Sequence, residues 1–413
     1  MKKTITNLTL VLAFFLVMKA NGQRAFITNT DNTISVINVA TNTLVTTMAG
    51  FNNPFGVSVS RDGTRVYVCN QGNDTVSVIS TATNTVINNV HVGLSPKGCA
   101  LTYDGAVLFV TNYSDGTVSR INTATNSVTS TITVGSLPYG IAVNNAGTRV
   151  YVCNSGDTSV SVINVSTNAV IATIHVGNSP AGIAVTPDGS KVYVVNSNYN
   201  ANTVSVINTT TNTVTATIAV GTNPFEIAIT PDGTKAFVTN TSDGTISVIN
   251  TSNNSVTTPI TINQYLYGIA ITPDGTKAYV ANGNNNTVNI VNTSTYGVTV
   301  ACAVGVDPQA FGNFISTYPV TTVGIETINT QLANVSVNPN PFTNTAMLVI
   351  NDGRTFNNTL SIYNMLGQEV KSMFIGNEKE VSINRDNLPD GMYFYKLISD
   401  NNETLATGKI VVE

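Results

Sequence analysis

Apolar and polar residues alternate in short runs along most of the chain, and the runs return at a nearly constant interval. A strand-like segment that ends in Asn occurs seven times, at residues 25–29, 66–70, 108–112, 150–154, 192–196, 236–240 and 278–282. Successive copies start 41, 42, 42, 42, 44 and 42 residues apart. Alternation with a period of two indicates strands, and this interval fits one four-stranded blade of a β-propeller.

One repeat unit, residues 180–220, shows the expected order of strands most clearly. After a Pro-x-Gly motif, we expect four strands at residues 183–185, 192–196, 203–208 and 214–220. Asp188-Gly189 suits a tight hairpin between the first two strands, because this pair adopts positive φ easily. A single small sheet cannot bury both faces, so the units are expected to stack radially. Small and large residues alternate along the first strand, which favours large-into-small packing between neighbouring blades.

The two ends of the repeat region complement each other. The first copy, at residues 24–29, has no Pro-x-Gly strand before it, whereas residues 308–315 provide such a strand at the far end. We therefore expect one blade to combine strands from both ends, which would leave no exposed sheet edge at the ring closure.

The N-terminal 22 residues differ from the repeats. Lys2 and Lys3 precede an apolar run at residues 8–18, which is followed by Ala20-Asn21-Gly22. This order is typical of a secretory signal peptide, so residues 1–22 are expected to be removed. The run is short for a membrane span, although an N-terminal anchor is the alternative. No later stretch predicts a transmembrane segment.

The period stops near residue 317, where a different module begins. Residues 318–334 are expected to form a linker, and alternation with turn residues in 335–413 predicts a small antiparallel β-sandwich. The predicted fold is therefore all-β, with a seven-bladed β-propeller of four-stranded blades at residues 24–317 followed by this sandwich.

The repeat region resembles a known family. The segments VYVVN at 192–196 and AFVTN at 236–240 are close to the signature of YVTN-type, surface-layer-like β-propeller repeats, and TVSVIN at 203–208 also fits. The resemblance covers about residues 24–317. It implies a seven-bladed propeller, often on exported or cell-surface proteins, without implying one activity.

The C-terminal module resembles the sorting domain of type IX secretion cargo. Four segments carry the resemblance in order, VSVNPNPF at 335–342, LSIYNMLGQEV at 360–370, GMYFYKL at 391–397 and GKIVVE at 408–413. The resemblance implies passage across a Bacteroidetes-type outer membrane with the type IX machinery as partner. Removal of the signal, followed by surface attachment or release, is what the resemblance normally implies. An ordinary Ig-like accessory domain is the alternative.

Composition and motifs exclude several classes of function. Charged residues make up 10% of the chain and the net charge is −4, which does not suit a nucleic-acid binder. Serine-hydrolase, nucleotide-binding, zinc-protease and C-x-x-C motifs are absent from the sequence. His91 and His175 share a repeat position, on the expected outer strand, that holds Met, Thr or Ala in other units. A catalytic role for either histidine is therefore not expected.

The cysteines occupy strand positions, where they are expected to act as small apolar residues. Cys69 and Cys153 lie two units apart, too far for a disulfide, whereas a bond between Cys69 and Cys99 remains open. Arg120 stands where other units have Val, and its long side chain is expected to reach water.

Aspartates recur at two loop positions. The first hairpin holds Asp62, Asp104, Asp188, Asp232 and Asp274. The loop between the second and third strands holds Asp31, Asp74, Asp115, Asp157 and Asp243. Both sets are expected to form turns. Calcium binding by the second set is open, but the ligand spacing is not clustered, so no metal or cofactor is predicted.

The middle residues of the Pro-x-Gly motifs form the most suggestive set. They are Phe55, Lys97, Tyr139, Ala181, Phe225, Tyr267 and Gln309, and Glu226 replaces the Gly of its motif. We expect them at the mouth of the central channel, where the first strands begin. The loops between second and third strands are expected on the same face of the propeller. By analogy, propeller ligands often bind there. The candidate ligand-binding residues are Phe55, Lys97, Tyr139, Phe225, Glu226 and Tyr267. The alternative is aromatic packing between blades. In the alternation along the first strand, these side chains fall on the same face as the Ile and Val that are expected to be buried.

These observations favour a non-catalytic binding, adhesive or structural role at the cell surface or outside the cell. The ligand class would be a glycan, a peptide or a matrix component. The alternative is a metal-assisted lactonase-like hydrolase on the same scaffold. Only Glu226 offers a carboxylate in the mouth set, which is few ligands for a metal.

Overall fold

The structure is a computed structural model that describes residues 17–21, 23–198, 202–257, 259–262, 265–316, 320–324, 334–351, 358–364, 369–399 and 404–413. The chain divides into two compact units, Met1–Ile325 and Glu326–Glu413. All regular elements within these residues are strands, so the all-β prediction is confirmed. In the same residues, no helix could span a membrane.

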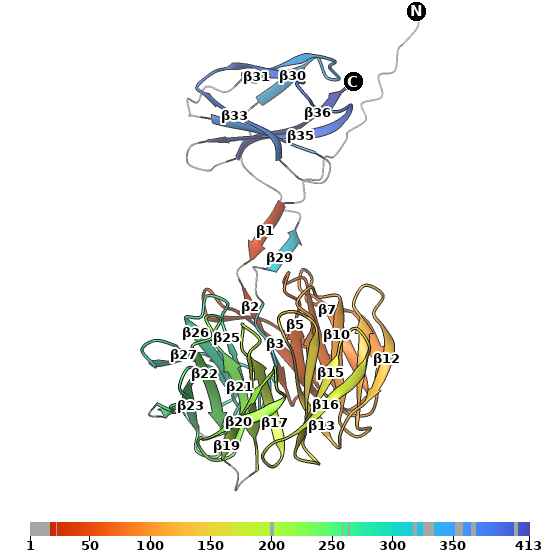
Figure 1. The fold of residues 1–413 in the computed structure, drawn as a ribbon. Helices are drawn as coiled ribbons and strands as arrows, with labels where there is room; N and C mark the ends of the chain where they lie inside the picture. The colour runs from red at the N-terminus through yellow and green to blue at the C-terminus, as the bar shows by residue number, and fades with distance from the viewer. Residues whose placement is uncertain are drawn as a thin grey trace, which may run out of the picture. The chain divides into compact units, whose positions relative to one another are not determined.

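The first unit is a propeller built from antiparallel sheets in chain order (Figure 1). The innermost strands are β5 (Pro54–Val59), β9 (Pro96–Leu101), β13 (Pro138–Val143), β17 (Pro180–Val185), β21 (Pro224–Ile229) and β25 (Leu266–Ile271). The second strands are β2 (Arg24–Asn29), β6 (Arg65–Asn70), β10 (Val107–Asn112), β14 (Arg149–Asn154), β18 (Lys191–Asn196), β22 (Lys235–Asn240) and β26 (Lys277–Asn282).

The third and fourth strands complete each blade toward the outside. The third strands are β3 (Thr33–Asn38), β7 (Thr75–Ser80), β11 (Thr117–Asn122), β15 (Ser159–Asn164), β19 (Thr203–Asn208), β23 (Thr245–Asn250) and β27 (Thr287–Asn292). The outer strands are β4 (Thr43–Ala49), β8 (Thr85–His91), β12 (Ser127–Thr133), β16 (Ala169–His175), β20 (Thr213–Ala219), β24 (Ile260–Thr261) and β28 (Val298–Ala303).

One blade takes its innermost segment from the far end of the propeller, as predicted. Sheet β2-β3-β4 has three strands, and residues 308–316 run antiparallel beside β2. The amide of Phe26 donates to the Phe314 carbonyl at 2.9 Å, and the amide of Gln309 donates to the Thr28 carbonyl at 2.8 Å. We call residues 308–316 the closing segment. It completes the seventh blade.

The Asn that ends each second strand closes the loop to the third strand. Asn154 is fully buried. Its Nδ2 donates to the hydroxyls of Ser159 and Ser161, each at 2.9 Å. The same pattern joins Asn112 to hydroxyls of β11. The recurrence of Asn therefore has a structural cause, because a buried amide needs partners.

Blades pack face to face through apolar side chains. Tyr151 and Val160 of one blade belong to the same buried cluster as Ile183 and Val194 of the next blade. The glycine of the Pro-x-Gly motif allows the inner strands to approach closely. A Cβ on Gly56 would lie 2.0 Å from the carbonyl oxygen of the next blade's inner strand. This packing supports the radial stacking expected from the repeat.

The second unit is a sandwich of two antiparallel sheets, ordered β30-β31-β34 and β33-β32-β35-β36. Its strands are β30 (Asn334–Asn338), β31 (Thr345–Asn351), β32 (Asn358–Tyr363), β33 (Glu369–Gly376), β34 (Glu380–Asn384), β35 (Gly391–Ser399) and β36 (Thr404–Val412). Leu348, Leu360, Ile362 and Leu397 are fully buried between the sheets. The predicted sandwich is confirmed.

A further pairing joins segments that the sequence pattern did not connect. Strand β1 (Val17–Asn21) pairs antiparallel with β29 (Val320–Gly324). The first lies in the expected signal peptide and the second in the expected linker. The pairing is not visible in local alternation, because its two strands are far apart in the sequence.

Candidate functional site

Aromatic side chains from several blades converge inside the channel, around a ring of the closing segment. The centroid of Phe311 lies 5.4 Å from that of Phe55, 5.2 Å from that of Tyr139 and 5.7 Å from that of Phe225. Tyr267 extends the set, with its ring 5.5 Å from that of Phe225. We call these five residues the aromatic layer. Edge-to-face and stacked contacts at such distances are favourable.

The rings contact one another across the channel because each inner strand contains a register shift. Pro138 pairs with Asn154, but Ile141 pairs with Val152, so one extra residue lies between the two pairs. The alternation is therefore interrupted at Tyr139. Because of this bulge, the ring of Tyr139 does not follow the alternation that would place it between blades with the buried Ile and Val side chains.

The five rings differ in exposure. Phe55 and Phe311 are buried, with 7% and 3% of their surface exposed. Tyr139, Phe225 and Tyr267 are partly exposed. The layer therefore has a packed centre and an accessible rim.

Lys97 lies over the same rings. Its ammonium is 4.5 Å from the centroid of Phe55, 5.3 Å from that of Tyr139 and 5.4 Å from that of Tyr113. Burial lowers the pKa of Lys97 to about 8. Tyr113 follows β10, so this end of the channel carries the loops between second and third strands. The aromatic faces stabilise the charged form of the amine by cation–π attraction.

Glu226 brings a carboxyl group into the inner wall of the propeller. It is 3% exposed. Its Oε1 accepts a hydrogen bond from the amide of Ile227 at 3.1 Å, whereas Oε2 has no hydrogen-bond partner among the described residues. Burial raises the pKa of Glu226 to about 8, so the carboxyl is mostly protonated at neutral pH. Burial, and then the nearby Glu226, also raises the pKa of Tyr139.

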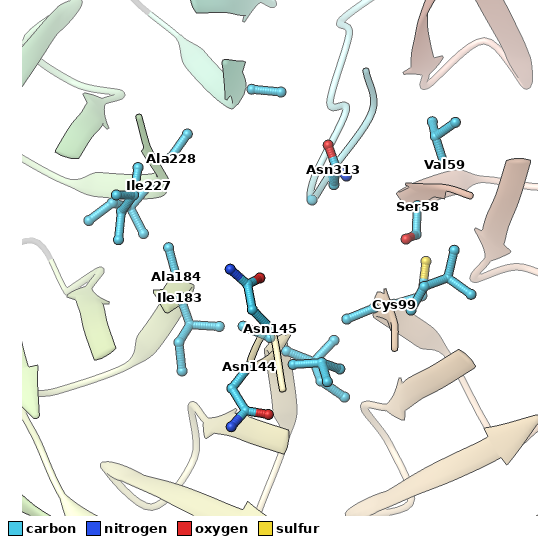
Figure 2. A pocket seen from close by; sticks show the side chains of 18 of the residues that line it. Ser58, Val59, Cys99, Asn144, Asn145, Ile183, Ala184, Ile227, Ala228 and Asn313 are labelled. Carbon is cyan, nitrogen blue, oxygen red and sulfur yellow. The ribbon is translucent and has the colours of Figure 1, made fainter. Parts of the chain in front are cut away.

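The other half of the channel is a cavity of about 470 Å³. The later residues of the inner strands and the first hairpins line it, whereas the aromatic layer lies where these strands begin. Figure 2 shows inner-wall residues such as Ile183, Ala184, Ile227 and Ala228 around an open centre. Glu226 is among the lining residues. One channel therefore has an aromatic end and an open end.

The structure thus brings together Phe55, Lys97, Tyr139, Phe225 and Tyr267, whereas Glu226 lines the cavity. The other two members of the predicted mouth set, Ala181 and Gln309, are buried. Sequence reasoning missed Phe311 and Tyr113. Phe311 lies two residues after Gln309, the middle residue of the last motif. Tyr113 directly follows the repeated Asn112, and it is the aromatic residue at that repeat position.

The remaining candidates have structural roles or lie away from the channel. His91 and His175 are exposed at the ends of the outer strands β8 and β16. All four cysteines are free thiols. Burial, and then a hydrogen bond to Cys99, raises the pKa of Cys69. Arg120 is partly exposed and donates to Thr129 Oγ1 at 2.8 Å, which satisfies part of its guanidinium.

Both aspartate sets serve turns. Hydrogen bonds from the Thr186 hydroxyl and the Ser190 amide lower the pKa of Asp188 in its hairpin. Asp157 Oδ2 accepts from the amide of Ser136 at 2.8 Å, which joins two loops of one face. Across the described part of the chain, no group of three or more His, Cys, Asp or Glu residues could hold a metal ion.

Two protein families match this chain. Residues 26–131 and 141–261 match the family described as "Lactonase, 7-bladed beta-propeller". These residues make up more than half of the chain. Residues 336–413 match the "Secretion system C-terminal sorting domain".

Solved structures support the fold alone, because their sequence identity is low. Hydrazine synthase from Kuenenia stuttgartiensis is 24% identical, with a TM-score of 0.54 over 59% of this chain and 78% of that chain. A functionally unknown protein from Desulfotomaculum acetoxidans DSM 771 is 16% identical, with a TM-score of 0.60 over 70% of this chain and 100% of that chain. No curated protein matches the chain.

The repeat, the radial sheets and the family matches agree with one another. The chain belongs to the β-propeller family described as "Lactonase, 7-bladed beta-propeller", and its C-terminal sorting domain directs it through type IX secretion to the cell surface or the extracellular space.

Proposed function

We propose that the protein is a non-catalytic binding protein, and that its ligand rests on the aromatic layer at one mouth of the channel. The observation that carries the proposal is the cluster of Lys97 with the partly exposed rings of Tyr139, Phe225 and Tyr267. These residues come from four blades. Such faces suit a sugar ring or a cationic group, which makes a glycan the favoured ligand class.

A binding measurement tests this site. The protein with residues 335–413 still attached is titrated by calorimetry with a panel of bacterial and host polysaccharides, and the strongest binder is then titrated against Tyr139→Ala and Phe225→Ala. Each substitution should weaken binding between about twofold and about tenfold, because one stacked ring is lost. Phe374→Ala is the control, since Phe374 is 72% exposed on the sorting domain. Equal affinity in all three variants would contradict the proposal.

The route to the surface also has a defined test. We propose that residues 1–22 lead the chain to the periplasm and that residues 335–413 provide the signal for export across the outer membrane. A chain without residues 335–413 should fold and accumulate in the periplasm. Fusion of these residues to a foreign periplasmic protein should export that protein. Normal surface amounts of the truncated chain would show that this division of roles is wrong.

A hydrolase is the second candidate, because the family match includes lactonases and because Glu226 Oε2 is unpartnered beside the cavity. The described residues do not fit a catalytic metal, since Glu226 has no companion ligands. Hydrolysis of glucono-δ-lactone, followed by pH-stat titration with and without divalent metal ions, separates the two candidates. Turnover that disappears in Glu226→Gln would favour the hydrolase, and so would a stoichiometric metal ion in the purified protein.

A further inference from the structure

The first hairpins of six blades differ at one position, and the difference falls at the open end of the channel. Three blades have proline there, Pro187, Pro231 and Pro273, whereas the three preceding blades have Arg61, Tyr103 and Asn145. Arg61, Tyr103 and Asn145 line the cavity, and the three prolines do not.

The turn itself does not require these three polar residues. In the Arg61 hairpin the amide of Gly63 donates to the Ser60 carbonyl at 2.9 Å, and in a proline hairpin the amide of Gly189 donates to the Thr186 carbonyl at 2.8 Å. Both residue types form the same turn, and proline is well suited to it. Turn formation therefore does not explain why these three hairpins have arginine, tyrosine and asparagine at this position.

The guanidinium of Arg61 lies over the ring of Tyr103 of the next blade. The guanidinium carbon lies 3.6 Å from the centroid of the Tyr103 ring. An arginine in contact with an aromatic face keeps N–H groups that can donate hydrogen bonds to a ligand. Within the described residues, Arg61 has no ion pair or side-chain hydrogen bond.

The carboxylates of the two hairpins form no ion pair with Arg61 among the described residues. Asp62 accepts hydrogen bonds from Ser60 and Thr64 in its own hairpin. Asp104 is occupied in the same way by Thr102 and Ala106. Glu226 is mostly neutral at pH 7, because burial raises its pKa to about 8. The guanidinium of Arg61 therefore lines the cavity without an ion-pair partner among the described residues.

Apart from Glu226, the opposite wall of the cavity is apolar. It is formed by Ile and Ala pairs on three successive blades, namely Ile183, Ala184, Ile227, Ala228, Ile269 and Ala270. Figure 2 shows the amides of Asn145 and Asn313 extending toward the open centre. Asn145 Nδ2 donates to the Pro187 carbonyl at 2.8 Å, which orients this amide.

We propose that this cavity binds a small organic carboxylate that carries an apolar body. The carboxylate pairs with the guanidinium of Arg61, the apolar body lies against the Ile and Ala wall, and Asn145 and Asn313 provide lateral hydrogen bonds. A planar guanidinium matches the two oxygens of a carboxylate. A single positive charge suits a singly charged ligand better than a phosphate dianion. The site is separate from the aromatic layer, so it does not depend on the proposed function.

Calorimetric titration of the full secreted protein with 3-phenylpropanoate tests the proposal. The matched ligand 3-phenylpropanamide keeps the apolar body without the charge, and acetate keeps the charge without the body. The wild-type protein should bind 3-phenylpropanoate at least about tenfold more tightly than either control ligand.

Three variants then assign the interaction to Arg61. Arg61→Gln should weaken 3-phenylpropanoate binding by about tenfold or more and remove the preference over the amide. Arg61→Pro should do the same in a hairpin that three other blades already form, which guards against misfolding. Arg120→Gln makes the same charge change on strand β11 and should leave binding unchanged. Equal affinity for carboxylate and amide in the wild type, or equal binding by Arg61→Gln and Arg120→Gln, would overturn the proposal.

Discussion

The two ends of the channel are built by the same inner strands, yet they differ in content. At one end, Phe55, Tyr139, Phe225 and Phe311 fill the centre with rings. At the other end, alanines and isoleucines leave a cavity of about 470 Å³. The backbone repeat is nearly the same in every blade, so the difference lies in the side chains at the two ends of the inner strands and in Phe311 of the closing segment.

The comparison also shows where the propeller departs from its own repeat. The aromatic end contains a lysine whose pKa is lowered by burial, and the inner wall contains a carboxyl whose pKa is raised by burial. Burial of ionisable groups is unfavourable unless they are paired. Each of these two groups therefore lowers the stability of the folded chain in the pH range where burial shifts its ionisation.

The closing segment connects the two ends, and its loss should have the largest effect. Deletion of residues 306–316 removes the inner segment of one blade together with Phe311. We expect the entire propeller to lose cooperative unfolding or to melt at least about 10 °C lower. Circular dichroism melts of the deleted and intact chains test this. An unchanged melting temperature would show that the ring does not depend on the closing segment.

Loss of the central ring should be the next largest effect. Phe311→Ala leaves a void among three other rings, and substitutions of this kind lower the free energy of unfolding by about 3–5 kcal/mol. Urea unfolding measures the difference. A loss below about 1 kcal/mol would mean that the layer is loosely packed.

Glu226 should make stability fall as pH rises. Its pKa is raised from 4.5 to about 8 in the folded protein. Between these pH values the unfolded chain releases the proton and the folded chain retains it, so the free energy of unfolding decreases. Glu226→Gln should remove this slope and stabilise the protein at pH 7 by on the order of 3 kcal/mol. Parallel pH profiles of both proteins would refute the assignment.

Lys97 should make the free energy of unfolding rise with pH, in a higher pH range than that of Glu226. Its pKa is lowered from 10.5 to about 8. Between these values the unfolded chain keeps the proton that the folded chain has lost, so the free energy of unfolding rises with pH. The effect should be smaller than that of Glu226, because the lysine is only partly buried. Lys97→Met should flatten urea-unfolding stability between pH 8 and 10.5, whereas a retained slope would point to another group.

The smallest effect on stability is expected at the open end. Arg61→Gln should change the free energy of unfolding by less than about 0.5 kcal/mol, because the side chain is partly exposed and forms no ion pair among the described residues. The same urea titrations measure it. A loss comparable to that of Phe311→Ala would mean that both ends are equally structural, and the contrast between them would disappear.

The architecture could be read from the sequence because its information is local. Each blade pairs strands that are neighbours in the chain, so the interval near 42 residues and the repeated Asn were enough to predict seven blades. The closing segment could also be predicted, since one unit lacked a first strand and the far end provided one. The sorting domain was recognisable from four short segments in a particular order.

The content of the channel depended on tertiary structure. A one-residue register shift near Tyr139 turns the ring into the channel, and strict alternation does not reveal such a bulge. Phe311 meets rings from three other blades only after the ring has closed. Arg61, Tyr103 and Asn145 share a repeat position in the sequence, but only radial packing places them around one cavity. Contacts across a channel join residues that are distant in the chain, so they follow from the closed geometry rather than from any local pattern.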